Sequence, residues 1–260
     1  MTNRVAHSKT SDFSLGQNNE FIAEFGRQGG NPDLLQALIE NKARMVRVVA
    51  IARGDETPKG YALATLILGD DFISHEDVAN AYGFHYSDEQ VEAFTDTLPD
   101  EKTLQWLRSN GYMLVATPTT DTNLLQVRDL DNQLFYSKSE GWYTESQHTF
   151  SREDVVKAGQ WLMVRKEPYP NSCSKNWGEQ QKLLTEVEYV PNAPEVAYAV
   201  TAYYKVRGVY LLKGVYVRTS SVDAVGGHVD VGGFDEDGLR VGSCWRGCRF
   251  GCFGVSSARK

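Results

Sequence analysis

The sequence of 260 residues predicts an α+β protein, in which a helical and α/β region precedes a C-terminal domain of two helices and antiparallel strands. Three observations predict this class. Helix-capping signals are frequent between residues 70 and 110, two helical segments follow Trp161, and alternating apolar and polar residues continue from Val215. Because helical and strand signals are largely segregated along the chain, an α+β arrangement is expected.

The N-terminal segment contains one clear helical signal. Residues 1–30 form a polar tail that need not be ordered. Asn31 is a favourable N-cap and Pro32 suits the first helical position. The helix that they begin places four apolar side chains on one face: Leu34, Leu35, Leu38 and Ile39. The Val-rich run Met45–Ala52 is expected to be a buried strand and Tyr61–Leu68 a second one, which together suggest a small α/β unit.

Residues 70–110 are expected to form three short helices. The signals are two capping-box spacings and two glycines at helix ends: Ser74 with Asp77, Ser87 with Gln90, Gly83 and Gly111. Tyr112–Ala116 predicts a strand, and residues 123–150 predict a connection with one or two strands. The N-terminal α/β and helical region is therefore expected to span residues 31–150.

The C-terminal domain is expected to span residues 151–260. Its first strand is Trp161–Arg165, and Ser174 is expected to cap a short helix. A second helix begins after Pro191 or Pro194 and ends at Gly208. Its core positions have helical spacing, although a strand is the alternative because Val and Tyr abound: Val196, Ala199, Val200 and Tyr203. The later segments alternate as strands do: Val215–Thr219, Val229–Val231 and Leu239–Val241.

Composition limits the function classes. A net charge of −7 and a pI near 5.3 argue against a general nucleic-acid binder, which needs a basic face to displace counterions from phosphate. No signal peptide or membrane-spanning segment is visible, so synthesis as a soluble protein is expected, with the final location left open. The four cysteines do not form the even, spread pattern of a disulfide-rich domain, and reduced thiols are expected.

Catalytic signatures are weak. The Gly-x-Ser-x-Gly and papain-type patterns are absent, and Ser172–Lys175 matches Ser-x-x-Lys without a partner motif. Residues 235–237 are three acids beside a glycine, which are more typical of a solvated turn than of a calcium site. His228 and Asp230 share one face of a strand, where the sequence allows a functional pair but favours an exposed polar pair. We therefore expect a non-enzymatic protein without catalytic residues, metal or cofactor.

Two alternative functions rest on local patterns. Residues 78–94 have the spacing of a helix-turn-helix, as in a DNA-binding regulator, but the second helix carries several acids and no Lys or Arg, so phosphate would repel it. Cys244, Cys248 and Cys252 could supply zinc ligands together with His228, as in a zinc-binding domain. Zinc sites usually include a tight cysteine pair, and this segment has none.

The segment Ser-Cys-Trp-Arg-Gly-Cys-Arg-Phe-Gly-Cys at residues 243–252 has neither helical nor strand periodicity, yet strand-like sequence frames it on both sides. Together with Val215–Ser221, Gly238–Val241 and Gly254–Lys260, it resembles the variable proteins of diversity-generating retroelements. The resemblance implies a C-type-lectin-like fold. In that family a reverse transcriptase rewrites adenines late in the gene, so that Asn or Tyr codons become other codons ending in a pyrimidine. Every residue from 243 to 253 except Trp245 belongs to the resulting set.

The resemblance implies a variable region of about residues 229–260 on a constant scaffold, with Trp245 and Gly254 as scaffold residues. Nine positions are implied as ligand-binding display positions: Ser243, Cys244, Arg246, Gly247, Cys248, Arg249, Phe250, Gly251 and Cys252. The calcium motifs and disulfides of sugar-binding C-type lectins are absent, so a protein ligand is expected, with no nucleic acid and no membrane span. The ligand, the oligomeric state and display on a virion or cell surface stay open.

Overall fold

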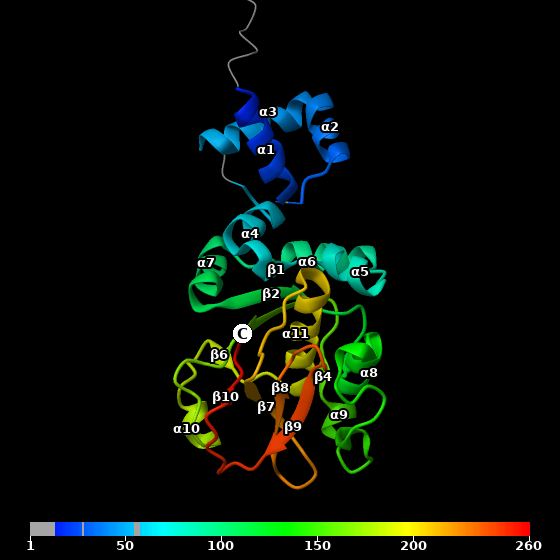
Figure 1. Ribbon diagram of the computed structural model, residues 1–260, viewed down its shortest axis with the longest axis vertical. Helices are drawn as coiled ribbons and strands as arrows, with labels where there is room; N and C mark the ends of the chain where they lie inside the picture. The colour runs from blue at the N-terminus through cyan, green and yellow to red at the C-terminus, as the bar shows by residue number, and fades with distance from the viewer. Residues whose placement is uncertain (1–13, 28, 55–57) are drawn as a thin grey trace, which may run out of the picture. The chain divides into compact units, whose positions relative to one another are not determined.

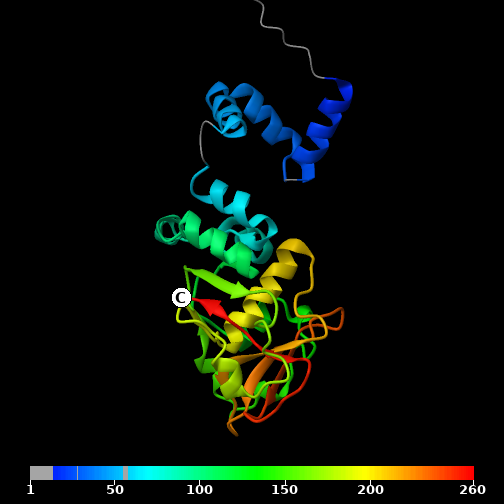
Figure 2. The ribbon, with the colours of Figure 1, turned by 90° about the vertical axis from the view of Figure 1, so that its left-hand side faces the viewer.

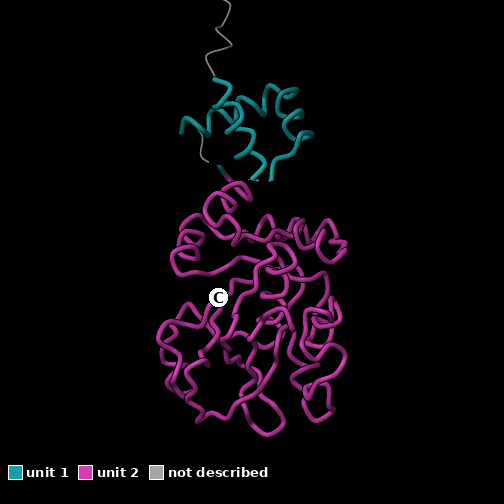
Figure 3. The backbone as a smooth tube through the Cα atoms, viewed as in Figure 1, with its two compact units in different colours: residues 1–58 teal, residues 59–260 magenta. Residues whose placement is uncertain are grey.

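The computed structural model describes residues 14–27, 29–54 and 58–260. The chain divides into two compact units, residues 1–58 and residues 59–260 (Figure 3). The described residues contain both helices and several sheets, which confirms the expected α+β class. The first thirteen residues of the expected polar tail lie outside the described residues.

The first unit contains three helices, α1 (Leu15–Arg27), α2 (Pro32–Glu40) and α3 (Lys42–Arg53) (Figure 1). Asn31 caps α2 as expected, because its side chain accepts a hydrogen bond from the Leu34 amide. Two expectations were wrong: α1 lies within the expected tail, and Met45–Ala52 is helical. The Asn41 side chain caps the start of α3, and Gly54 ends it in the left-handed conformation, with φ of 79°. The apolar pattern of residues 45–52 alone fits either a helix or a strand, and these caps favour the helix.

The second unit begins with four helices. Their bounds are Tyr61–Leu68 for α4, His75–Tyr82 for α5, Asp88–Asp96 for α6 and Glu101–Asn110 for α7. Both expected capping boxes and both glycine ends are confirmed. The expected strand at residues 61–68 was wrong, because this segment forms α4. Its Ala64 and Leu68, four residues apart, are buried on one helical face, and a glycine lies at each end.

A five-stranded sheet crosses the expected boundary at residue 150. Its order is β1-β2-β5-β11-β6, and every neighbouring pair is antiparallel except β1 with β2. The bounds are Phe72–Ile73 for β1, Tyr112–Ala116 for β2, Trp161–Arg165 for β5, Glu188–Tyr189 for β6 and Ala258–Arg259 for β11. All five residues of β2 pair with β5. The chain therefore divides near residue 58 and not at residue 150.

The connection between β2 and β5, which was expected to contain one or two strands, contains two short strands as well as helical turns. It contains α8 (Leu124–Leu130) and α9 (Phe150–Glu153), and β3 (Thr122–Asn123) pairs with β4 (Val155–Val156). Single turns of 3-10 helix lie at Asn132–Leu134 and Trp142–Thr144, and another precedes β1 at Gly69–Asp71. The weak alternation of this segment reflects these short turns and not an extended sheet.

A second sheet has the order β10-β7-β8-β9. Its bounds are Tyr216–Val222 for β7, His228–Gly232 for β8, Arg240–Cys244 for β9 and Phe253–Val255 for β10. The β7-β8 and β8-β9 pairs are antiparallel, and β10 runs parallel to β7. These strands confirm the late alternating segments of the sequence.

Helix α11 (Ala193–Arg207) lies between the two sheets (Figures 1 and 2). It contacts α5 and α8 as well as strands of both sheets, and residues 193, 194 and 196–203 are all buried. A helix that is buried on all sides needs apolar residues all round. This requirement explains the Val, Ala and Tyr content that left a strand as the alternative. The four expected core positions are buried, and Gly208 ends the helix.

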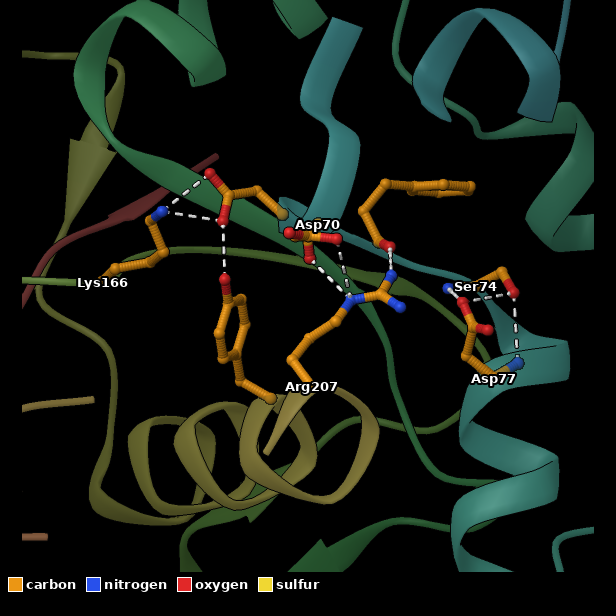
Figure 4. Close-up of polar contacts among 8 residues, drawn as sticks. Asp70, Ser74, Asp77, Lys166 and Arg207 are labelled. Carbon is orange, nitrogen blue, oxygen red and sulfur yellow. Dashed lines mark hydrogen bonds and ion pairs between the residues drawn. The ribbon is translucent and has the colours of Figure 1, made fainter. Parts of the chain in front are cut away.

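Polar contacts attach the last turns of α11 to the segment around β1 (Figure 4). The Asp71 carboxylate accepts hydrogen bonds from Lys166 Nζ at 2.7 Å and from the Tyr203 hydroxyl at 3.1 Å. Arg207 donates to the carbonyls of Asp70 and Phe72 at 3.0 and 2.8 Å. The helical segment, the five-stranded sheet and α11 are therefore joined within one unit.

Candidate functional site

Residues 245–252, which we call the terminal loop, connect opposite edges of the four-stranded sheet (Figure 1, orange to red). Cys244, at the end of β9, pairs with His228, which itself pairs with the end of β7. Phe253, at the start of β10, pairs with Tyr216 at the beginning of β7. The loop therefore crosses from one edge and end of the sheet to the opposite edge and end.

The two faces of this sheet differ in chemistry. Val217, Val229 and Val231 belong to the apolar core that includes α11. Side chains alternate along a strand, so Arg218 and Asp230, which pair in register, lie on the other face. The terminal loop crosses this polar face, where Arg218 contacts it.

The framework holds the terminal loop through alternate main-chain carbonyls. The Trp177 amide donates to the Arg246 carbonyl at 3.0 Å, and the Ser174 amide donates to the Phe250 carbonyl at 3.1 Å. Between them, Arg218 Nη2 donates to the Cys248 carbonyl at 2.9 Å. The Tyr216 amide donates to the Cys252 carbonyl at 2.8 Å. These four contacts use backbone atoms of the loop, so they do not depend on the identity of its side chains.

Two of these donors come from the segment around α10 (Trp177–Gln181). Asn176 caps this short helix, because its side chain accepts from the Glu179 amide and the Glu179 side chain accepts from the Asn176 amide. The expected cap at Ser174 was wrong. Ser174 instead has a φ of 60°, and its amide points to the loop carbonyl of Phe250. Glu179 also forms an exposed ion pair with Arg249 at 2.9 Å.

Arg218 is the central side chain beneath the loop, and it is fully buried. Besides the loop carbonyl, its Nη1 atom donates to Gln180 Oε1 at 2.8 Å and to the Lys175 carbonyl at 3.2 Å. Burial lowers the pKa of its guanidinium, which nevertheless stays protonated. Arg218 was not among the expected site residues, because a charged residue in an alternating strand is expected to face solvent.

His228 and Asp230 lie on the same face as expected, but the expectation that they are exposed was wrong. Both are buried, at 5% and 2% exposure. The His228 ring stacks on Trp177 with 3.7 Å between ring centroids, and burial with Arg246 nearby lowers its pKa to about 4. Burial raises the pKa of Asp230 to about 7, while Arg218 acts in the opposite direction. The loop therefore covers a polar layer in which His228 is neutral at pH 7 and Asp230 holds its proton to a higher pH than an exposed carboxyl group does.

Most of the expected display positions are exposed. Seven of the nine are solvent-exposed: Ser243, Arg246, Gly247, Arg249, Phe250, Gly251 and Cys252. Cys248 is half-buried and Cys244 is buried, so Cys244 is not available for display. Gly254 is buried, and a Cβ there would lie 2.5 Å from Pro168 Cβ. Trp245, expected as scaffold, is instead 61% exposed and adds a large aromatic group to the surface.

The cysteines differ from the expected reduced state. Cys244 and Cys248 form a disulfide that closes a turn, in which the Cys248 amide donates to the Trp245 carbonyl at 2.9 Å. Cys173 and Cys252 are free thiols. A spacing of four residues did not suggest this bond, because the bend between the two cysteines cannot be inferred from spacing alone.

The zinc-binding alternative loses two of its ligands to this disulfide, and His228 faces the Trp177 ring. Within the described ranges, no group of three or more His, Cys, Asp or Glu side chains is placed to hold a metal ion. The helix-turn-helix candidate lies in α5 and α6. Val78 and Phe94 of these helices are buried in the core, while Asp88, Glu89 and Glu92 are exposed. An acidic exposed surface does not favour phosphate.

Comparison of the chain with protein-family models, with curated proteins and with solved structures finds no match. Over the part of the chain that the structure describes, none of the helices has the length and apolar character needed to cross a membrane. The residues and geometry of the terminal loop are therefore the basis for assigning a function to the chain.

Proposed function

We propose that this chain is a non-enzymatic recognition protein whose terminal loop presents exchangeable side chains to a protein ligand. The observation that carries the proposal is the attachment of the loop through four alternate carbonyls, those of residues 246, 248, 250 and 252. A loop held by its backbone can change its side chains while its path stays fixed. Binding loops on rigid scaffolds generally combine these two properties.

The exposed side chains have the chemistry of a protein-binding surface. Trp245 and Phe250 are 61% and 54% exposed, and Arg246 and Arg249 are exposed beside them. Aromatic residues and arginine are enriched at protein interfaces, and Trp and Arg are frequent among the residues that dominate binding energy. Arg246 also favours a ligand with an acidic patch, whereas Arg249 already pairs with Glu179.

The same loop supports membership of the variable proteins of diversity-generating retroelements, with a C-type-lectin-like domain inside the unit of residues 59–260. In support, the seven exposed display positions coincide with residues that rewritten Asn or Tyr codons can encode. The half-buried Cys248 and the buried Cys244 belong to the same set but are joined as a disulfide. The two helices α10 and α11 and the antiparallel strands are the elements that the resemblance implies.

The proposal is tested with a display library of the full chain that randomises the seven exposed positions. Panning against unrelated purified proteins, such as lysozyme and serum albumin, should yield binders to several of them, with thermal midpoints close to that of the parent. A matched library randomises exposed positions of α6, Asp88, Glu89, Glu92, Thr95 and Asp96, and should yield none. Loss of folding in most loop variants, or equal success of the α6 library, would contradict the proposal.

The gene provides a second test. We expect a near-copy of the gene's 3′ end close to the gene. The copy should differ from the gene at adenines and lie beside a reverse transcriptase gene. Isolates should then differ at the seven exposed codons, while the codons of Arg218 and Gly254 stay constant. Variation spread evenly over residues 151–260 would argue against a diversified loop.

A further inference from the structure

The segment that precedes α10 runs alongside the end of the terminal loop and the start of β10 (Figure 1). The Tyr169 amide donates to the Val255 carbonyl at 2.9 Å, and the Val255 amide donates to Ser172 Oγ at 3.1 Å. The Ser174 amide donates to the Phe250 carbonyl at 3.1 Å. The two segments therefore run in opposite directions, because the higher residue number on one side faces the lower number on the other.

Two free cysteines lie between these contacts, one on each segment. Cys173 immediately precedes Ser174, and Cys252 lies in a turn that the hydrogen bond from the Phe253 amide to the Phe250 carbonyl closes at 3.2 Å. The same Phe250 carbonyl accepts from the Ser174 amide, so the turn of one cysteine is attached to the neighbour of the other. A disulfide requires Cα atoms within about 7 Å of each other, and the hydrogen bonds on either side of the two cysteines bring their backbones together.

The two thiols differ in their access to solvent. Cys252 is exposed and Cys173 is half-buried. Burial, together with the nearby Cys252, raises the pKa of the Cys173 thiol. Thiol oxidation starts at an exposed thiolate, so Cys252 is the group that meets a reagent first and Cys173 is placed to react second. An exposed thiol with a second thiol beside it is the usual arrangement of a reversible oxidation site.

We propose that Cys173 and Cys252 form a second, reversible disulfide when the chain meets a low-molecular-mass disulfide such as oxidised glutathione. The Cys252 thiolate attacks one sulfur of the reagent, a mixed disulfide forms and one glutathione thiolate leaves. The Cys173 thiol then gives its proton to solvent, and its thiolate attacks the Cys252 sulfur and releases the second glutathione thiolate. Two cysteine thiols are thereby oxidised, and one glutathione disulfide is reduced to two thiols.

This bond would tie the end of the terminal loop to the segment before α10, whereas the Cys244–Cys248 bond closes a turn at the start of the loop. Both ends of the loop are then held covalently. The inference does not require that the loop has a ligand. A chain with another residue at position 252 could not form the bond.

The test equilibrates the full chain with glutathione buffers of increasing oxidised fraction, blocks free thiols with iodoacetamide and digests the chain with trypsin. Cleavage after Lys and Arg places Cys173 in the peptide of residues 167–175 and Cys252 in that of residues 250–259, and it separates both from Cys244 and Cys248. Mass spectrometry should find these two peptides joined. In the native fold the bond should form at least about tenfold more readily than in urea, because the fold keeps the two thiols close together.

The comparison with urea uses Cys244→Ser/Cys248→Ser, in which no other cysteine can exchange. Cys173→Ser is the matched control, and it should retain one glutathione on Cys252 as a mixed disulfide. Three outcomes overturn the inference: separate glutathione adducts on the two cysteines of the native chain, equal bond formation with and without urea, or a bond from Cys252 to Cys244 or Cys248. Because the readout is a bond within the chain, a loop without any ligand leaves the result unchanged, and the two proposals can fail separately.

Discussion

At the scale of single residues, Arg218 links the framework to the terminal loop. It is fully buried and donates to the Cys248 carbonyl, the Gln180 side chain and the Lys175 carbonyl. Removing a buried charged donor leaves its acceptors without partners in a place that water does not reach. The consequence should therefore exceed that of a surface ion pair.

Arg218→Met is expected to lower the free energy of unfolding by about 2 to 4 kcal/mol, because the lost hydrogen bonds are buried and charge-assisted. Urea denaturation followed by circular dichroism measures this change. Lys157→Met is the matched control, since the Asp121–Lys157 ion pair is exposed and its loss should leave the free energy of unfolding nearly unchanged. Equal losses in the two variants would show that Arg218 has no special role.

The neighbours of Arg218 make stability depend on pH in opposite directions. The folded state raises the pKa of Asp230 from 3.8 to about 7, so this group favours folding below pH 4 and loses that contribution as pH rises to about 7. The folded state lowers the pKa of His228 from 6.5 to about 4, so its contribution is present above pH 6.5 and is lost as pH falls to about 4. Between these limits the two slopes offset each other.

Single variants should therefore separate the two slopes. Relative to the parent, Asp230→Asn is expected to gain stability as pH rises from 4 to 7, and His228→Gln as pH falls from 6.5 to 4. A single titrating group changes the free energy of unfolding by at most about 1.4 kcal/mol per pH unit. Denaturation curves at half-unit pH intervals measure both. Curves of the two variants that run parallel to the parent would exclude these buried titrations.

At the scale of elements, two glycines distinguish the loop from its frame. A Cβ at Gly247 in the loop would meet nothing within 4 Å, whereas at Gly254 in β10 it would meet Pro168 Cβ at 2.5 Å and Ser172 Oγ at 2.7 Å. Gly247→Ala should change stability by less than about 0.5 kcal/mol. Gly254→Ala should lower it by about 1 to 3 kcal/mol. Thermal unfolding compares the pair, and similar losses at both positions would mean that the loop is packed as tightly as the strand.

The disulfide at one end of the loop gives a chemical prediction. Denatured but unreduced protein should incorporate two equivalents of iodoacetamide, at Cys173 and Cys252, and reduced protein four. Chain-entropy arguments give about 2 kcal/mol for closing so short a segment. Cys244→Ser/Cys248→Ser should lower stability by about that amount. Mass spectrometry that finds four modified cysteines without reduction would show the bond to be absent.

Local signals predicted the elements that have local causes. The capping boxes at Ser74 and Ser87 correctly placed two helices, because a cap and its partner lie within one turn. Short apolar runs without such signals gave wrong predictions, such as the strand expected at residues 61–68, which form a helix. The exposed, irregular segment of the site was expected from its sequence. Its support from Arg218, from the Trp177 amide and from the disulfide was not, because these contacts depend on a sheet register and a bend that separate segments create together.

At the scale of the whole molecule, the apolar core belongs to one unit. The buried hydrophobic cluster runs from Ala64 to Ala258 and includes no described residue of α1, α2 or α3. The second unit therefore contains the interactions that its own folding requires.

A fragment of residues 59–260 should accordingly fold as the full chain does. Its thermal midpoint is expected within about 4 °C of the parent's, since a change of 1 kcal/mol shifts the midpoint of a domain of this size by about 2–4 °C. Circular dichroism gives its unfolding curve. A fragment that fails to fold would show that the first unit supports the second, contrary to the separation of their contacts.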